Sequence, residues 1–574
     1  MKIHSNCPEG AGTGLRSTLL AATALALALA GATACAAKPD GDGSHDDLVA
    51  LFDEFVDWRD PPVLTDTRVV GAGPGALPVY DSEYVAERRE ALAAMQARLH
   101  DMGVDGWDRP QQADWLTVRA LMDEMDFILH VTRPWARDPN FYVDHLLRIA
   151  FTELPVSGEE SDALQARLRE IPPFLEQARA NLTDVPGDYA DIALFNLTTE
   201  DGVNAGHPRR PVPPPGLIGW YEDLLGRAQS EQSALTDDVR GALDAIRGYR
   251  DWLEANRDAM TAEAGVGRER LDWFLQHVKM LPYTADEIAV LARREMERQR
   301  AFLALERHRN RDLPELTLPA SEEEYLQRLA DTDAMIRDWL VADEIITIPD
   351  FVPTDWQEMG FNVPWVEREG PPNFWEQIQY RDPSPDHLHA VIPGHRFDGW
   401  VERYNERPVR GRISFGDRRE GWALYLEDAA LQLGLFDDND RPRTRELTYI
   451  MGLWRAARTL GDVWLQTNEK SAQDTIDWWV EVTPYMDKGV ARRYAYLRPS
   501  PAHGLHYTMG SLQMYRLLAD RYMQLGDDFV LQDFHDEFMS RGRVPISLVR
   551  WDMTGLDDDA DMLWNHTPLS ELLD

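Results

Sequence analysis

The spacing of apolar residues constrains the fold of this chain most strongly, because it repeats at three- and four-residue steps along most of the length. One such stripe consists of Trp115, Val118, Met122, Met125 and Leu129. This period places the side chains on one face of a helix. A second stripe runs from Leu164 to Leu182, where Pro172 and Pro173 predict a break or kink. The pattern predicts a mostly α-helical protein whose stripes form the core.

Three local signals refine this outline. Thr284 followed by Glu287 has the capping-box spacing and predicts the start of a long helix. The segment 343–351, "DEIITIPDF", is β-branched, short and bounded by proline, which predicts a strand. The proline-rich segment 207–216, "HPRRPVPPPG", predicts a stiff connector. We therefore expect mostly α structure, with a small β-sheet just before the histidine-rich segment that follows.

The N-terminus has the pattern of an export signal. Lys2 and Arg16 precede the apolar run 19–30, which is too short to span a bilayer and ends in small residues before Cys35. This pattern resembles a bacterial lipoprotein cleavage site, with lipid attached to Cys35; plain secretion is the alternative. We expect a signal peptide over 1–35 and a flexible tether over 36–47. One large domain over 48–574 would then comprise a helical part (48–206), the connector and a metal-site part (217–574).

Composition narrows the functional classes. The formal charge of −40 opposes binding to nucleic acid or to an anionic membrane surface. Cys7 and Cys35 are the only cysteines, so removal of the signal leaves no internal disulfide. We therefore expect an envelope protein that faces the periplasm and contacts the membrane only through its N-terminal lipid.

A histidine-rich segment, "HLHAVIPGHRF" at 387–397, is the best candidate for chemistry. His389 and His395 are six residues apart, which on an unbroken helix is a rotation of about 600° and would turn the rings away from each other. Pro393 and Gly394 interrupt the helix and allow His395 to be redirected. Glu420 follows 25 residues after His395. Two histidines and a carboxylate are a plausible ligand set for zinc, although a histidine-rich surface loop has the same composition.

Several motifs resemble a bacterial family called domain of unknown function 885, which is similar to the gluzincin zinc metallopeptidases, including the carboxypeptidase Taq type. They are "HAVIPGHRF", "EGWALYLED", "MGLWRAARTLGD", "HYTMGSLQMYRL" and "FHDEFMSRGRVPISLV". The similarity extends from about residue 265 to 550. It implies one large helical domain with the active site in a deep cleft, and peptide or amide bonds as substrates.

The resemblance also implies roles for individual residues. His389, His395 and Glu420 correspond to the metal ligands of the family, and zinc is the expected ion. Tyr507 corresponds to a tyrosine that stabilises the oxyanion in related peptidases. A phenol there could donate a hydrogen bond to the negative charge that develops on the attacked carbonyl oxygen. A buried tyrosine with a purely structural hydroxyl is the alternative for Tyr507.

The sequence departs from the family pattern at the residue that should move the proton. The family has a glutamate directly after the first histidine, and here Ala390 stands in its place. General acid–base catalysis contributes roughly 10²–10⁴-fold, so this loss is large. Arg396, Gln466 and His503 also replace family residues. We considered His503 as a replacement proton-transfer group, because on a helix it would share a face with Tyr507.

Other candidates for proton transfer are His387, Asp398 and Glu427, each of which also has a structural interpretation. Three functions remain open on the sequence alone. The first is a metallopeptidase-like hydrolase with altered proton transfer. The second is a catalytically silent pseudopeptidase that binds a peptide or envelope component. The third is metal-assisted chemistry of another kind, by a lyase or an amidase.

Overall fold

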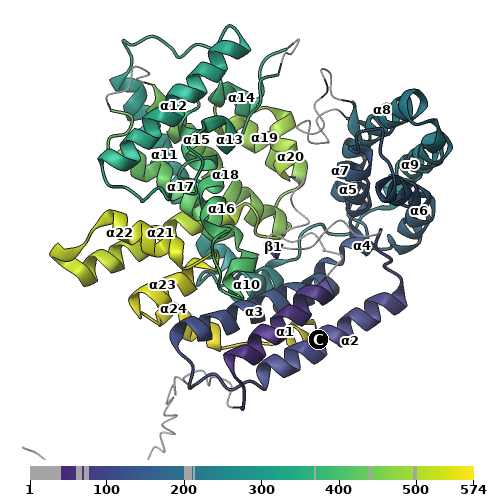
Figure 1. Cartoon of the computed structure of the whole chain (residues 1–574), viewed down its shortest axis with the longest axis horizontal. Coiled ribbons are helices and arrows are strands. Elements are labelled where there is room, and N and C mark those ends of the chain that lie inside the picture. Colours follow the sequence, from purple (N-terminus) through teal and green to yellow (C-terminus); the bar gives the residue numbers. More distant parts are fainter. Residues whose placement is uncertain are drawn as a thin grey trace, which may run out of the picture.

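The computed structural model describes residues 41–59, 68–69, 77–199, 210, 214–366, 370–437, 443–495 and 501–573. The expected signal peptide with Cys35, residues 36–40 of the tether and most of the proline-rich connector lie outside these residues. Helix α1 begins at His45, so the last three residues assigned to the tether are helical. Within the described residues, α-helices dominate (Figure 1), which confirms the mostly α prediction.

The first three long helices lie together at the base of the molecule in Figure 1. They are α1 (His45–Arg59), α2 (Ser82–His100) and α3 (Arg109–Phe127). The first apolar stripe lies on α3 and on the π-helical turn Ile128–Thr132 that follows it, and all of its residues are buried. Asp108 and Gln111 form a capping box at the start of α3, which satisfies two otherwise unpaired backbone N–H groups.

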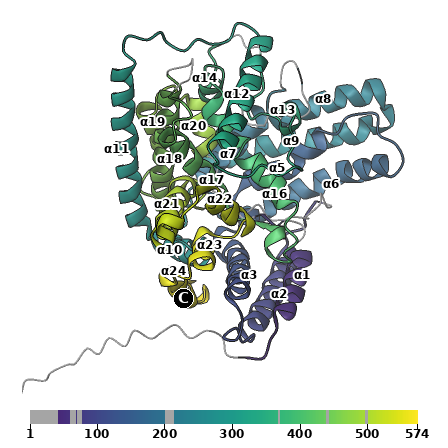
Figure 2. The ribbon, with the colours of Figure 1, turned by 60° about the vertical axis from the view of Figure 1, so that its left-hand side comes forward.

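A second group of helices forms a lobe that projects to one side of the molecule (Figure 2). It consists of α4 (Pro134–Arg137), α5 (Pro139–Ala150), α6 (Glu159–Asn181), α7 (Gly187–Thr198), α8 (Gly216–Glu231) and α9 (Thr236–Asn256). The hydroxyl of Tyr221 on α8 donates to the carbonyl of Leu146 on α5, and Tyr249 on α9 donates to Pro139. Helices on both sides of the connector therefore share one core.

The remaining helices build the main body. The first of them are α10 (Arg268–His277), α11 (Ala285–Arg309), α12 (Glu322–Ala342), α13 (Trp356–Met359), α14 (Phe374–Gln379), α15 (Ser384–Ala390), α16 (His395–Glu402) and α17 (Gly416–Gln432). They are followed by α18 (Thr444–Gln466), α19 (Ala472–Val482), α20 (Lys488–Ala495), α21 (Leu505–Leu525), α22 (Leu531–Ser540), α23 (Ile546–Thr554), α24 (Asp558–Trp564) and α25 (Ser570–Leu573). The capping box of Thr284 and Glu287 at the start of α11 is confirmed.

Helices α17 and α21 cross at very short range because glycine faces glycine. A Cβ atom at Gly421 would lie 2.5 Å from the Cα of Gly510. Only glycine allows backbones to approach this closely. The crossing fixes the start of α17 against the start of α21, and these two segments carry Glu420 and Tyr507.

Two secondary-structure predictions are wrong. Residues 343–351 form no strand, and the sheet expected from them is not formed. The β-structure among the described residues that forms named strands is a two-residue antiparallel pairing of β1 (Arg68–Val69) with β2 (Ile413–Ser414). Helix α6 also runs unbroken through Pro172 and Pro173.

In the described part of the chain, no helix is both long and apolar enough to cross a membrane.

Candidate metal centre

The break between α15 and α16 brings the two histidines together. His389 is the second-last residue of α15, and His395 is the first residue of α16. Gly394 lies so close to the preceding turn that a Cβ atom there would overlap the carbonyl of His389. The chain can therefore turn tightly enough to place the two imidazole rings 4.7 Å apart, at an angle of 82°. This confirms the proposed role of the Pro-Gly interruption.

The third member of the group, Glu420, comes from the first turns of α17. The indole N–H of Trp422 donates to the carbonyl of Pro393 at 2.9 Å, so the Glu-Gly-Trp run is tied directly to the Pro-Gly turn. Glu420 Oε2 lies 3.4 Å from His389 Nε2 and 3.2 Å from His395 Nε2. All three candidate ligand atoms lie within 4.8 Å of one another.

These distances fit a zinc ion. Two ligands held about 2.0–2.1 Å from a tetrahedral zinc are about 3.3 Å apart, close to the two observed separations. Glu420 Oε2 is buried and accepts no hydrogen bond in the structure, although it lies beside two ring nitrogens. Two imidazole nitrogens and one carboxylate oxygen leave a fourth coordination position open, which is the donor set of catalytic rather than structural zinc sites.

A second carboxylate, that of Glu427, orients His389 through the ring nitrogen that does not face Glu420. Glu427 Oε1 lies 2.7 Å from His389 Nδ1, and Arg455 Nη2 on α18 lies 2.8 Å from the same oxygen. Nδ1–H then donates to Glu427, which leaves the lone pair of Nε2 directed at Glu420 and the metal position. Glu427, which we considered as a proton-transfer group, is instead occupied by His389 and Arg455.

The charge states of Glu420 and His395 suit metal binding, whereas burial and Arg455 are outweighed at His389, whose pKa Glu420 and Glu427 raise above its ordinary value. Burial opposes ionisation of Glu420, but the adjacent His395 and His389 hold the pKa of its carboxyl well below the usual range. Burial lowers the pKa of His395 below the ordinary value for histidine. A carboxylate that stays ionised and an imidazole that stays neutral are the forms that bind a metal.

Tyr507 lies beside this group, as the resemblance implied. It belongs to the first turn of α21, and its ring is nearly parallel to that of His389, with centroids 6.3 Å apart. Burial, and then the charge of Glu420, raises the pKa of Tyr507 to about 12. The phenol therefore keeps its proton at neutral pH and can act as a donor.

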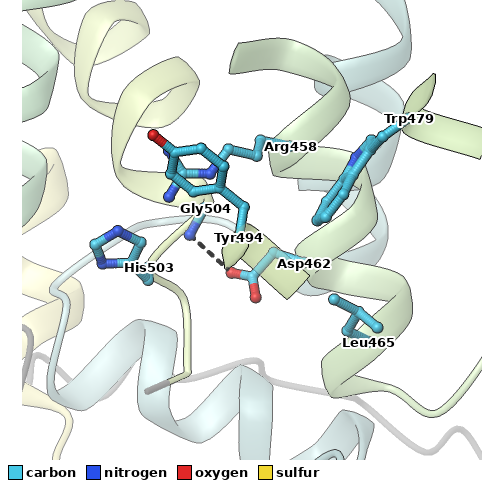
Figure 3. Close-up of a pocket in the computed structure, with 7 residues that line it drawn as sticks. All are labelled: Arg458, Asp462, Leu465, Trp479, Tyr494, His503 and Gly504. Atoms are coloured by element: carbon cyan, nitrogen blue, oxygen red, sulfur yellow. Dashed lines mark hydrogen bonds between the residues drawn. The ribbon is translucent and has the colours of Figure 1, made fainter. Parts of the chain in front are cut away.

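His503 lies in a pocket that Arg458 also lines. Helix α21 begins at Leu505, so His503 precedes it and does not share a helical face with Tyr507. It lines a small pocket with Arg458, Asp462, Leu465, Trp479, Tyr494 and Gly504 (Figure 3). The helical argument that linked His503 to Tyr507 is wrong, and the metal-ligand group does not include His503.

The other departures from the family pattern lie on three helices, α15, α16 and α18. Ala390 is buried next to His389. Arg396 donates to the carbonyls of Met359 and Phe361 and ties the loop after α13 to α16. Gln466 ends α18, about 16 Å along the helix from Arg455.

Two further proton-transfer candidates have structural partners. His387 Nε2 lies 2.9 Å from Asp333 on α12. Asp398 pairs with Arg418 at 3.4 Å and with Arg543 at 2.9 Å. Both side chains hold neighbouring segments of the chain together.

Sequence reasoning missed two arginines, Arg455 and Arg458, which are 2% and 3% exposed. They are three residues apart in the otherwise apolar run "MGLWRAARTLGD", so they share a helical face. A pair of charges inside an apolar helical stretch is costly to bury, and that was the available signal.

The order of these motifs along the helices matches a known protein family. The model of the family described as "Bacterial protein of unknown function (DUF885)" matches residues 66–354 and 381–553. This chain belongs to that family. Its match includes all three candidate ligands, Glu427, both arginines and Tyr507. Among curated proteins, none matches the chain.

Two solved structures share the fold of this DUF885 member. One, from Shewanella oneidensis, is titled a "putative lipoprotein of unknown function"; it aligns with a TM-score of 0.67 at 16% identity, over 89% of this chain and 100% of that one. The other, from Colwellia psychrerythraea, is titled "the putative lipoprotein" and aligns with a TM-score of 0.59 at 15% identity, over 85% and 92%. At this identity the likeness concerns the fold alone.

Proposed function

We propose that this protein is a metal-dependent hydrolase of peptide or amide bonds, resembling the gluzincin metallopeptidases, with zinc held by His389, His395 and Glu420. The observation that carries the proposal is the convergence of two Nε2 atoms on one unbonded carboxylate oxygen at 3.2–3.4 Å. A bound zinc ion would supply Lewis acidity and a more acidic water. The substrate would enter a deep cleft beside His395, the most exposed of the three ligands.

The residues around the metal position would bind the substrate, orient His389 and transfer the proton. Tyr507 donates its phenol proton in a hydrogen bond to the oxygen of the attacked carbonyl. The guanidinium of Arg458 packs against the ring of Tyr507, with its Cζ atom 4.7 Å from the ring centre. Glu427 and Arg455 hold His389 in the tautomer that presents Nε2. Ala390 transfers no proton, so another group, with His503 the leading candidate of this chain, must take that role.

A catalytically silent pseudopeptidase is the second candidate, and Ala390 is the observation that favours it. The same ligands would then hold a metal that organises a peptide-binding cleft without turnover. Metal-assisted chemistry by a lyase or an amidase requires the same site with a proton donor other than the missing glutamate.

We further propose that the mature chain is attached to the cell envelope through lipid on Cys35 and faces the periplasm. The apolar run before Cys35 and the titles of the two structural neighbours support this. Cys35→Ser should move the protein from the membrane fraction to the soluble fraction. Unchanged membrane association of that variant would refute the anchor.

Chelation tests the hydrolase most simply. Purified protein should cleave a peptide library slowly, lose that activity with a chelator and regain it with zinc. Metal binding without any cleavage would select the pseudopeptidase. Cleavage that survives both the chelator and His395→Ala would refute a metal-dependent reaction.

A further inference from the structure

The outer face of helix α11 is basic in a protein that is otherwise strongly acidic. Residues 290–311, on this helix and just after it, contain seven arginines and three glutamates, a formal charge of +4, whereas the whole chain carries −40. Helix α11 forms the edge of the molecule opposite to the projecting lobe in the view of Figure 2. A basic surface at the edge of the molecule can reach an external partner.

Most of these arginines are only weakly compensated by acidic side chains. Arg293, Arg294 and Arg300 are exposed and form no ion pair with any residue in the described ranges. Three more, which are at least half exposed, reach a carboxylate only at 3.5–3.9 Å: Arg307, Arg309 and Arg311. Exposed ion pairs of this length contribute little. The positive charge of the segment is therefore available to an anionic partner.

Apolar side chains are exposed on the same face of α11. Val290 is 54% exposed and Leu305 is 63% exposed, and Ala301 between them is exposed as well. At about 100° per residue, these three positions lie within about 60° of one another around the helix axis. Arg293 and Arg300, which are seven residues apart, lie together along one side of this apolar strip. The face thus combines apolar groups with a row of cations.

An apolar strip flanked by arginines fits the surface of an anionic membrane. There the headgroup phosphates pair with guanidinium groups and the acyl boundary takes up apolar side chains. A purely electrostatic partner would leave the exposed Val290 and Leu305 without a role. Glu297 is an exposed acid on this face, and its single charge leaves the face positive. The total charge of −40 does not prevent the contact, because charges beyond about 8 Å are screened at physiological ionic strength.

We propose that the outer face of α11 is a membrane-contact surface that binds the headgroups of anionic phospholipids. Arg293, Arg294 and Arg300 pair with the phosphates, and Leu305 and Val290 enter the interface. A basic patch is a second membrane signal beside a lipid chain, so this contact adds to the expected N-terminal lipid and lays α11 along the membrane plane. The inference does not depend on the hydrolase proposal or on the metal.

Vesicle co-sedimentation of the chain without its lipid tests this surface. The chain from residue 36 onward keeps every described residue and lacks the apolar run 19–30. At physiological ionic strength it should bind vesicles of phosphatidylcholine mixed with phosphatidylglycerol. It should bind vesicles of phosphatidylcholine alone about tenfold more weakly or less. Equal binding to both vesicles, or binding to neither, would overturn the inference.

Matched charge variants locate the contact on the molecule. Arg293→Gln/Arg300→Gln should lower the partition coefficient on the anionic vesicles about fivefold for each arginine removed. Arg148→Gln/Arg167→Gln removes the same charge from α5 and α6 of the projecting lobe and should leave the partition coefficient unchanged. Leu305→Ser should lower it about threefold, because the apolar contact is lost.

Thermal unfolding is the fold control for these variants, because the substituted side chains of α11 are exposed and their loss should leave stability near that of the wild type. Equal losses of binding in the α11 and the lobe variants would show an effect of total charge alone and would overturn the assignment to α11. Unchanged binding in the α11 double variant would do the same. Unchanged binding in Leu305→Ser would contradict insertion of the apolar strip.

Discussion

The candidate centre has two regions: a ligand side, formed by the residues that hold His389, His395 and Glu420 in place, and a proton-transfer side, formed by Ala390 and His503. The two regions differ in how closely they agree with the family resemblance. On the ligand side, Trp422 bonds to the Pro-Gly turn, Gly394 permits the sharp return of the chain, and Glu427 holds His389. On the other side, Ala390 stands where the family has a glutamate, and His503 lies in a neighbouring pocket. Under our proposal, holding a metal and moving a proton depend on different residues, and only the first set agrees with the family resemblance.

Placing a glutamate at position 390 should give the largest change in the rate of peptide cleavage. Ala390→Glu places a carboxylate next to His389, and a general base contributes roughly 10²–10⁴-fold. We expect a modest part of that range, about 10²-fold, as a gain in cleavage of a fluorogenic peptide. Ala390→Gln has the same size without the base and should give no gain. Vigorous wild-type cleavage that falls in Ala390→Glu, and is unaffected by His503→Ala, would show that the proton is moved by groups other than those proposed.

Removing the charge of Glu427, which lies against His389 Nδ1, should weaken metal binding without abolishing it. Glu427→Gln loses the negative charge that Nδ1–H and Arg455 share, and such partners contribute about 10–100-fold to metal affinity. Competition with a zinc-binding dye measures the change. Asp428→Asn is the control, because Asp428 pairs with Arg298 and Tyr515 instead. Equal zinc affinity in Glu427→Gln and the wild type would contradict the orienting role.

The bond between Trp422 and Pro393 should stabilise the fold and the ligand side together. Trp422→Phe leaves the buried carbonyl of Pro393 without this donor and should cost about 1–3 kcal/mol in the free energy of unfolding. Zinc affinity should fall as well, because Gly394 and His395 follow that carbonyl directly. Chemical denaturation with and without zinc measures both. Stability loss without any change in zinc affinity would separate the turn from the site.

The smallest predicted effect concerns pH. Burial, and then Asp398, raises the pKa of Glu402 on α16 to about 7. The folded pKa lies above the ordinary value, so this group's contribution to stability is present below about pH 4.5 and is lost as pH rises through 7. Relative to Glu402→Gln, the wild type should lose on the order of 1 kcal/mol between pH 5 and 8. A difference that is flat, or that grows with pH, would contradict this sign.

Much of the fold followed from local chemistry. The apolar stripes became buried helices, and Thr284 with Glu287 capped α11. The predicted strand at 343–351 does not form, because its backbone N–H groups donate hydrogen bonds to groups outside a β-sheet. Ile345 N–H bonds to the carbonyl of Leu340 at the end of α12, and Thr347 N–H bonds to Asp536. Pro172 and Pro173 lie towards solvent on α6, where the carbonyls they leave unpaired can reach water.

Only part of the candidate site could be predicted from the sequence. His389, His395 and Glu420 were predicted as one group from their spacing and from the family resemblance, and the structure brings them together. Arg455 and Arg458 were missed, because a helical run with two arginines gives no sign of which helix face meets the histidines. Their position depends on the packing of α18 against α15, α17 and α21, and no local pattern encodes it.

Metal content is the most direct test of the central claim that His389, His395 and Glu420 form a metal centre. Protein purified under zinc-replete conditions should carry one zinc per chain by elemental analysis, and His395→Ala should carry almost none while keeping its helical content. Full metal in His395→Ala, or no metal in the wild type, would contradict the account.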